Sequence, residues 1–182
     1  MTVANLITLI RVVLIPFFLA ALLYGDFKTA FFIFLIAGIT DSLDGFIARF
    51  FNQNSVLGSV MDPVADKLLL STAFICLTIP KSGEFYVIPI WVTLLTLSRD
   101  FIIILFVLIQ VLFFETEIKH FMPSFWGKCT TTVQIAFIIS VMLRNSYGLN
   151  KIIVDILLFG VVAFTLLSGF HYLWRTRNIE AK

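Results

Sequence analysis

The sequence predicts an all-α integral membrane protein, a bundle of six transmembrane helices. Of its 182 residues 60% are hydrophobic and 21 are Phe, whereas only 13% are charged. Such a composition is unlike that of soluble domains and of disordered chains. The chain also divides into six apolar stretches, and about 20 apolar residues are needed to span roughly 30 Å of hydrocarbon.

The six predicted spans use nearly the whole chain, so the sequence predicts a single domain over residues 1–182. The first resembles a secretory signal, but Arg11 lies inside its apolar run and no small-x-small cleavage site is evident, so we interpret it as a retained helix. The fourth is the longest, about 29 residues or roughly 43 Å of helix, and is expected to tilt or to project into the cytosol. The predicted spans are 5–24, 29–51, 59–79, 85–113, 129–143 and 152–174.

The loops predict how the spans are oriented. Most connections are short, which makes sequential helices antiparallel neighbours. Basic residues are enriched on the cytoplasmic side of membrane proteins. They are more numerous on the side that holds the loop after the second span, which we therefore place in the cytoplasm, as in a bacterial inner membrane or its equivalent. On that side lie Arg11, Arg49, Lys119, Lys128, Arg175, Arg177 and Lys182, and on the other Lys28, Lys81, Arg144 and Lys151.

Four aspartates flank the loop between the second and third spans. Asp41 and Asp44 are three residues apart, and Asp62 and Asp66 are four apart, so each pair shares one face of a helix. An Asp near the bilayer centre costs about 2.5–3.5 kcal/mol on insertion scales, and four carboxylates together repel one another. The pattern therefore predicts bound divalent cations, about two of them.

The residues around the aspartates agree with such a site. All-oxygen ligation suits Mg²⁺ or Mn²⁺ rather than zinc. Gly45, Ala48 and Gly58 are small enough to let a helix or a flat ligand approach closely. Arg49 could donate to a phosphate, although a basic anchor at a helix end is the alternative interpretation.

The spacing of these residues resembles the signature of the CDP-alcohol phosphatidyltransferase family. The chain reads Asp41-x-x-Asp44-Gly45-x-x-Ala48-Arg49, then eight residues, then Gly58-x-x-x-Asp62-x-x-x-Asp66. Residues 5–16 (NLITLIRVVLIP), 98–100 (SRD) and 127–134 (GKCTTTVQ) also resemble its phosphatidylglycerophosphate synthase and eukaryotic-type cardiolipin synthase branches.

The resemblance implies transfer of a phosphatidyl group from CDP-diacylglycerol to an alcohol, with release of CMP. It implies that Asp41, Asp44, Asp62 and Asp66 hold two divalent ions and that Asp66 is also the general base. Displacement at phosphorus suits a two-metal site. The residues expected to bind the CDP-linked lipid are Asn5, Thr8, Asp44, Gly45, Ala48, Arg49 and Gly58. For Asn5 and Thr8, helix capping or interhelical hydrogen bonding is the alternative.

The acceptor remains open between two alcohols. Arg11, Arg99 and Lys128 are cations on the cytoplasmic half that could bind a phosphorylated acceptor such as glycerol 3-phosphate. A cardiolipin synthase would instead use phosphatidylglycerol. An ion pair with one of the four aspartates or with Asp100 is the alternative role of Arg99, because charges within membranes are commonly paired.

Other classes of protein explain the pattern less well. A cation-coupled transporter predicts acids spread through the bilayer and inverted repeats, and neither is visible. A membrane prenyltransferase needs more spans than this chain provides. No basic run suggests nucleic acid binding, and the excess of apolar residues predicts contacts with membrane lipids and a homodimer.

Overall fold

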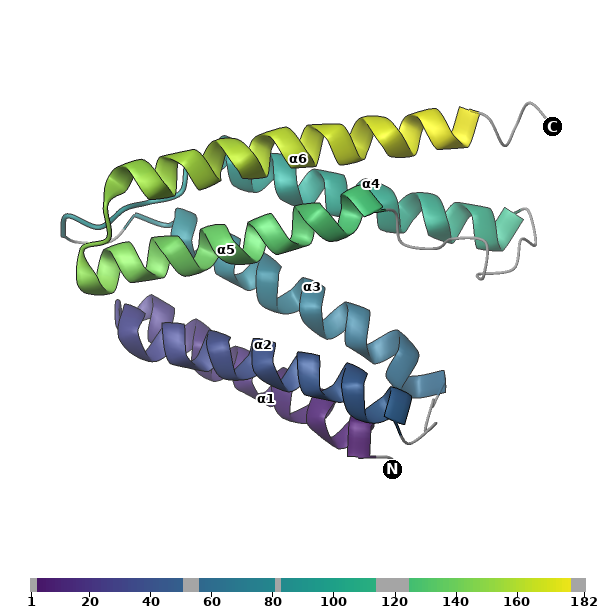
Figure 1. The fold of residues 1–182 in the computed structure, drawn as a ribbon, viewed down its shortest axis with the longest axis horizontal. Helices are drawn as coiled ribbons and strands as arrows, with labels where there is room; N and C mark the ends of the chain where they lie inside the picture. Colours follow the sequence, from purple (N-terminus) through teal and green to yellow (C-terminus); the bar gives the residue numbers. More distant parts are fainter. Residues whose placement is uncertain (1–2, 51–55, 81–82, 114–124, 178–182) are drawn as a thin grey trace. The chain divides into compact units, whose positions relative to one another are not determined.

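The computed structural model is all-helical, which confirms the predicted α class (Figure 1). It describes the backbone of residues 3–50, 56–80, 83–113 and 125–177, and the side-chain surroundings of residues 9–40, 65–80, 83–105 and 126–170. Within these ranges the chain forms six helices and no strand. They are α1 Val3–Leu23, α2 Phe27–Phe50, α3 Val56–Thr78, α4 Ile90–Phe113, α5 Phe125–Tyr147 and α6 Lys151–Arg177.

The fourth helix starts later than its apolar sequence predicts. Residues 85–89 precede the helix, and Pro89 accepts its first hydrogen bond, from the Val92 amide at 2.9 Å. A proline disfavours helical geometry at the residue before it, here Ile88. The predicted span of about 29 residues is therefore wrong: α4 has 24 residues, or about 36 Å of helix.

The turn between α1 and α2 combines a helix stop with a helix start. Gly25 adopts a φ of 77° and donates to the Leu22 carbonyl, while the Asp26 amide donates to Ala21. This pair of bonds is a Schellman motif, in which glycine adopts the left-handed conformation without strain. Asp26 then caps α2, because its carboxylate accepts from both the amide and the hydroxyl of Thr29, at 3.1 and 2.6 Å.

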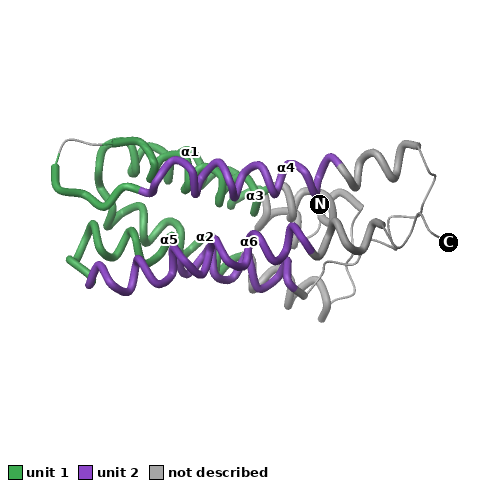
Figure 2. Tube along the Cα trace, turned by 90° about the horizontal axis from the view of Figure 1, so that it is seen from above, with its two compact units in different colours: residues 1–87, 138–149 green, residues 88–137, 150–182 purple. Residues whose placement is uncertain are grey.

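The described chain divides into two compact units, and α5 contributes to both (Figure 2). Unit 1 comprises residues 1–87 and 138–149, and unit 2 comprises residues 88–137 and 150–182. The predicted single domain over residues 1–182 stays a prediction.

In unit 1, α1 packs against both α2 and α3. The rings of Phe18 and Phe34 lie 5.7 Å apart between α1 and α2, and Phe74 of α3 is 2% exposed. The end of α5 ties down the loop after α3: the Asn145 side chain accepts from the Tyr86 amide at 2.8 Å and donates to the Tyr86 carbonyl at 3.1 Å. Helix α1 therefore packs against both α2 and α3 within this unit.

In unit 2, α4 packs against α6, and the first half of α5 is tied to α6. The buried Thr130 hydroxyl donates to the Phe164 carbonyl at 3.1 Å. Gly160 brings the two backbones close, because a Cβ there would meet a Val133 methyl at 3.3 Å. Small residues and interhelical hydrogen bonds of this kind are typical of helices packed within membranes.

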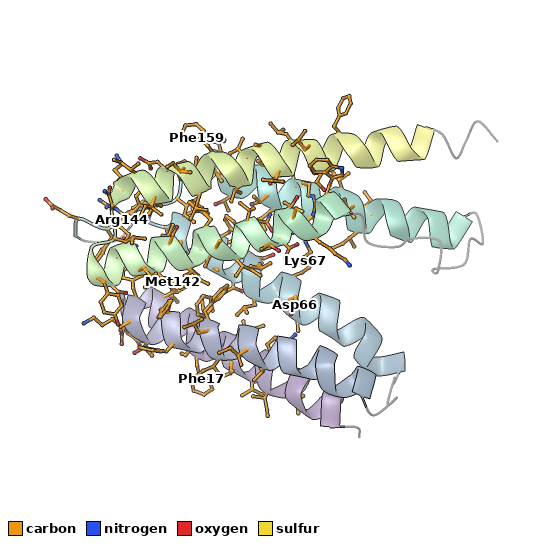
Figure 3. The ribbon with its side chains drawn as sticks, in the orientation of Figure 1. Phe17, Asp66, Lys67, Met142, Arg144 and Phe159 are labelled. Atoms are coloured by element: carbon orange, nitrogen blue, oxygen red, sulfur yellow. The ribbon has the colours of Figure 1, made fainter. Side chains whose placement is uncertain are left out.

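Two helices among the described residues are long and apolar enough to cross a membrane, 126–147 and 151–170. Shorter apolar helical segments cover 9–23 and 27–40. Large apolar side chains are exposed on several helices, and Figure 3 shows Phe17 and Phe159 projecting away from the helices that carry them. The two helices fit a membrane protein, and the six-span bundle stays a prediction.

Candidate active site

The described part of the predicted site centres on an ion pair between α1 and α3. Nη1 of Arg11 donates to Oδ1 of Asp66 at 2.7 Å. The Arg11 side chain is 0% exposed, whereas that of Asp66 is 40% exposed. The pair therefore presents a carboxylate to its surroundings and keeps the guanidinium inside the protein.

The helical pattern explains why both side chains meet. Arg11 lies seven residues before Phe18 and eleven before Leu22, on the same face of α1, and all three are buried. Asp66 precedes Leu69 by three residues and is therefore next to it on α3; Leu69 is buried. Packing of α1 against α3 thus brings Arg11 to the edge of the α3 face that carries Asp66.

The other three aspartates are placed by their backbones alone. Asp41 and Asp44 lie in the last turns of α2 and Asp62 in the first turns of α3, and five residues separate the two helices in the chain. The side chains of Asn5, Thr8, Asp41, Asp44, Gly45, Ala48, Arg49, Gly58 and Asp62 lie outside the part of the chain whose side chains are described. Their predicted convergence stays a prediction.

The described residues agree in chemistry with a hard divalent ion. Asp66 offers a partly exposed carboxylate, and Asp41, Asp44 and Asp62 lie at helical spacing on the backbones of α2 and α3. Oxygen donors of this kind are those that Mg²⁺ and Mn²⁺ prefer. Among the described side chains no group of three or more His, Cys, Asp or Glu gathers, so the four-aspartate site rests on the sequence motif.

The other two predicted acceptor cations belong to unit 2. Arg99 on α4 donates from Nη1 to Oδ1 of Asp100 at 2.7 Å and from Nη2 to the Ser168 hydroxyl of α6. Arg99 and Asp100 are only 10% and 13% exposed. The alternative role predicted for Arg99 is an ion pair with one of the four aspartates or with Asp100, and the structure contains the pair with Asp100. Lys128 is exposed on α5.

Ser168 is a buried contact that the sequence did not single out. It is 0% exposed and lies three residues after Thr165, which is 2% exposed. Small hydroxyl residues are common packing residues in apolar helices, so their sequence gave little sign of a charged partner. Arg99 nevertheless depends on this hydroxyl for one of its hydrogen bonds.

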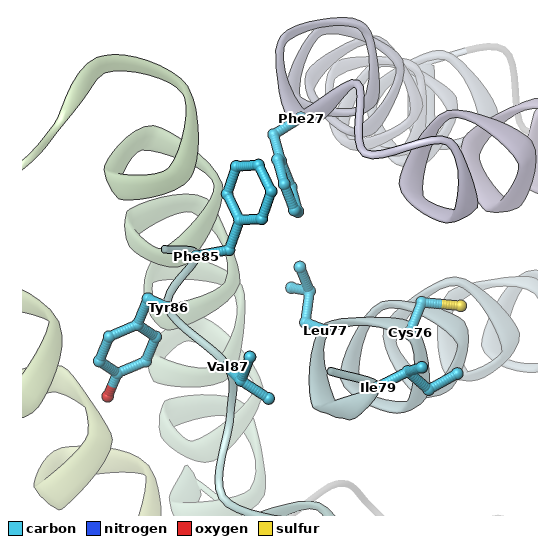
Figure 4. Close-up of a pocket in the computed structure, with 7 residues that line it drawn as sticks. All are labelled: Phe27, Cys76, Leu77, Ile79, Phe85, Tyr86 and Val87. Carbon is cyan, nitrogen blue, oxygen red and sulfur yellow. The ribbon is translucent and has the colours of Figure 1, made fainter. Parts of the chain in front are cut away.

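A small pocket at the far end of α3 is a packing feature rather than a second active site (Figure 4). Phe27 and Phe85 meet there with ring centres 4.9 Å apart, and none of the seven lining side chains is charged. Cys76 lies ten residues after Asp66, roughly 15 Å along the helix. The lining residues are Phe27, Cys76, Leu77, Ile79, Phe85, Tyr86 and Val87.

Comparison with known proteins agrees with the motif. The family model described as CDP-alcohol phosphatidyltransferase matches residues 1–167. The chain is 33% identical to a cardiolipin synthase (CMP-forming) of Rattus norvegicus, over 94% of this chain and 61% of that protein. It is 33% identical to a CDP-diacylglycerol–glycerol-3-phosphate 3-phosphatidyltransferase of Haemophilus influenzae, over 92% of this chain and 89% of that protein. A protein of the same name from Shigella flexneri is 34% identical, over 96% of this chain and 94% of that protein.

This chain belongs to the CDP-alcohol phosphatidyltransferase family. The match includes the whole stretch from Asp41 to Asp66 that carries the predicted signature. The chain spans 61% of the length of the rat and human cardiolipin synthases that it matches. The family is thereby established, and the acceptor is a separate question.

Proposed function

We propose that this chain is a phosphatidylglycerophosphate synthase, which transfers the phosphatidyl group of CDP-diacylglycerol to glycerol 3-phosphate and releases CMP. The observation that carries the proposal is the family match across the aspartate motif. Relatives named for this reaction align with 92% to 97% of the chain. The partly exposed Asp66 carboxylate supplies the base that such a reaction needs.

The reaction is displacement at phosphorus. A hydroxyl oxygen of the acceptor forms a bond to the phosphorus that carries diacylglycerol. The bond from that phosphorus to the bridging oxygen breaks, and its electron pair leaves with CMP. The hydroxyl proton passes to the carboxylate of Asp66, since a general base must lie within hydrogen-bond reach of the proton that it accepts.

Two Mg²⁺ or Mn²⁺ ions would be held by Asp41, Asp44, Asp62 and Asp66. Bound ions of this kind neutralise charge on the attacking and leaving oxygens of a displacement. Asn5, Thr8, Gly45, Ala48, Arg49 and Gly58 would line the CDP-lipid, together with Asp44. The chemistry of the donor set supports this assignment, because carboxylates are the ligands that hard cations prefer.

The membrane arrangement proposed for the chain has six spans, with the active site at the cytoplasmic face. Exposed Phe17, Phe159 and Phe170 support contact of the helices with lipid. The same apolar surface would also suit a homodimer. A site at the membrane surface would let the acyl chains of CDP-diacylglycerol stay in hydrocarbon while its pyrophosphate meets the aspartates.

Cardiolipin synthesis from phosphatidylglycerol is the second candidate, and one observation favours it. Arg11 and Arg99, two of the three cations expected to bind an anionic acceptor, are already paired with carboxylates and are nearly or wholly buried. Fewer exposed cations suit an acceptor with less charge than glycerol 3-phosphate.

A product assay separates these candidates. Purified protein is given CDP-diacylglycerol and a Mg²⁺ or Mn²⁺ salt, and CMP release is measured with glycerol 3-phosphate, phosphatidylglycerol, serine or inositol phosphate in parallel. We expect CMP release and phosphatidylglycerophosphate with glycerol 3-phosphate. Cardiolipin as the product would favour the second candidate, and an absence of CMP with every acceptor would contradict both.

A further inference from the structure

Arg11 is the one charged residue in the sequence of α1. Its side chain is 0% exposed and shares a buried helical face with Phe18 and Leu22. Burying a guanidinium is unfavourable unless charge and hydrogen bonds compensate it. Such a residue therefore needs a specific partner, and its place inside the helix packing sets which partner it reaches.

One such partner is the carboxylate proposed as the general base. Nη1 of Arg11 lies 2.7 Å from Oδ1 of Asp66, across the contact between α1 and α3. A charge-assisted hydrogen bond of this length is among the stronger ones in proteins. The exposure is uneven, 0% for Arg11 and 40% for Asp66, so a substrate can approach the carboxylate but not the guanidinium.

We propose that Arg11 is a positioning residue that acts through Asp66 and does not bind the acceptor. By holding Oδ1, it fixes the orientation in which the Asp66 side chain faces the acceptor hydroxyl. The inference rests on the proposed function and replaces the acceptor-binding role expected from the sequence. An orienting hydrogen bond matters here because catalytic groups must be held close to their productive geometry.

The proposal makes a kinetic prediction that differs from that of a substrate-binding arginine. Loss of an orienting contact lowers kcat and leaves KM for the acceptor unchanged, whereas loss of a phosphate contact raises KM. Hydrogen-bond partners of metal ligands typically contribute 10- to 100-fold to activity. We expect Arg11→Lys to lower kcat roughly 10- to 100-fold, since lysine keeps the charge but lacks the planar fork of donors.

The kinetic test uses Arg11→Lys and Arg11→Gln, purified in detergent, with CMP release measured at varied acceptor concentration. Lys28→Met is the control, because Lys28 is an exposed cation of the same unit. Its Nζ lies 5.4 Å from the centre of the Tyr147 ring. A lower kcat with the acceptor KM of the control supports the proposal. An unchanged kcat, or an acceptor KM above that of the control, overturns it.

A second measurement does not depend on activity. Thermal unfolding is followed for Arg11→Met, Asp66→Asn and the double variant without substrate or metal. We expect Asp66→Asn to lower the Tm less in the Arg11→Met background, because the guanidinium that pairs with the Asp66 carboxylate is absent there. Additive losses of Tm would show that the Arg11–Asp66 ion pair does not form in solution. A wild-type protein that releases no CMP would contradict the proposed function, while this cycle would still report whether the pair forms.

Discussion

Arg99 and Asp100 are neighbours in the chain, yet Nη1 of the first lies 2.7 Å from Oδ1 of the second. Adjacent residues on a helix point in different directions, so the long arginine side chain must reach round α4 to form this contact. The same guanidinium donates to the Ser168 hydroxyl of α6. One largely buried cation thus has a carboxylate from its own helix and a hydroxyl from the helix packed against it.

This arrangement predicts a graded loss of stability. Asp100→Asn leaves a largely buried guanidinium without its counter-charge and should lower the free energy of unfolding by about 3–5 kcal/mol. Ser168→Ala removes one hydrogen bond to a charged group and should lower it by about 1–3 kcal/mol. Unfolding in mixed micelles measures both effects.

Ser98→Ala is the matched control for Ser168→Ala. The exposed Ser98 hydroxyl donates to the Leu95 carbonyl of its own helix, so its removal should change stability by less than about 0.5 kcal/mol. Equal effects of the two Ser→Ala changes would mean that Ser168 does not support Arg99.

Gly148 and Gly38 should respond to alanine in opposite directions. Gly148 ends α5 with a φ of 73° and donates to the Arg144 carbonyl, whereas Gly38 lies inside α2. A Cβ would meet nothing within 4 Å at either position, so the backbone conformation alone determines how alanine changes the stability. We expect Gly148→Ala to destabilise by about 1–2 kcal/mol and Gly38→Ala to stabilise by about 0.5–1 kcal/mol. The same sign for both, measured by unfolding in micelles, would contradict the left-handed conformation at Gly148.

The stability contributed by Asp26 should depend on pH. Hydrogen bonds from the hydroxyl and then the amide of Thr29 hold the pKa of the Asp26 carboxyl below its ordinary value of 3.8. A carboxyl with a lowered pKa stabilises the folded state above its unfolded pKa and loses that effect as pH falls through the folded value.

Asp26→Asn can still cap α2 but carries no charge. We expect the Tm of the wild type to exceed that of Asp26→Asn near neutral pH and the gap to close below pH about 3.8. A difference in Tm between the two proteins that does not change with pH would show that the charge of Asp26 does not contribute to stability.

Asn145 should be required for the loop that precedes α4. Its side chain exchanges two hydrogen bonds with the backbone of Tyr86. Asn145→Ala loses both and should lower the free energy of unfolding by about 1–3 kcal/mol. Asn145→Asp keeps the acceptor for the Tyr86 amide but loses the donor to its carbonyl, so it should fall short of wild type as well. Wild-type stability in both variants, measured by thermal unfolding, would show that the hydrogen bonds between Asn145 and Tyr86 do not stabilise the protein.

The number and order of the helices followed from the sequence, because apolar runs of membrane length alternate with Gly, Pro, Asp and Asn. The start of α4 did not follow, since residues 85–88 are as apolar as the helix and only Pro89 separates them from it. Periodicity alone cannot tell an extended apolar segment from the first turn of a helix.

Long-range partners were harder to predict than the residues that need them. A lone Arg11 in an apolar run shows that compensation is required but does not say whether a substrate or a side chain supplies it. The answer depends on how α1 packs against α3, which brings together residues 55 positions apart. Asp100 could be named for Arg99 because it is adjacent in the chain, whereas Ser168 lies 69 positions away.

The aspartates provide the most direct test of the chemistry. Asp66→Asn removes the proposed base and should lower CMP release roughly 10²- to 10⁴-fold, with the protein still folded at the assay temperature even if its Tm falls. Asp62→Asn should abolish turnover, because it removes a proposed metal ligand. Chelation of divalent ions should stop CMP release by the wild type, and Mg²⁺ or Mn²⁺ should restore it. Asp26→Asn is the matched acid-to-amide control, since Asp26 is exposed at the start of α2, and it should retain wild-type activity. Wild-type turnover in both Asp62→Asn and Asp66→Asn would remove these carboxylates from the mechanism.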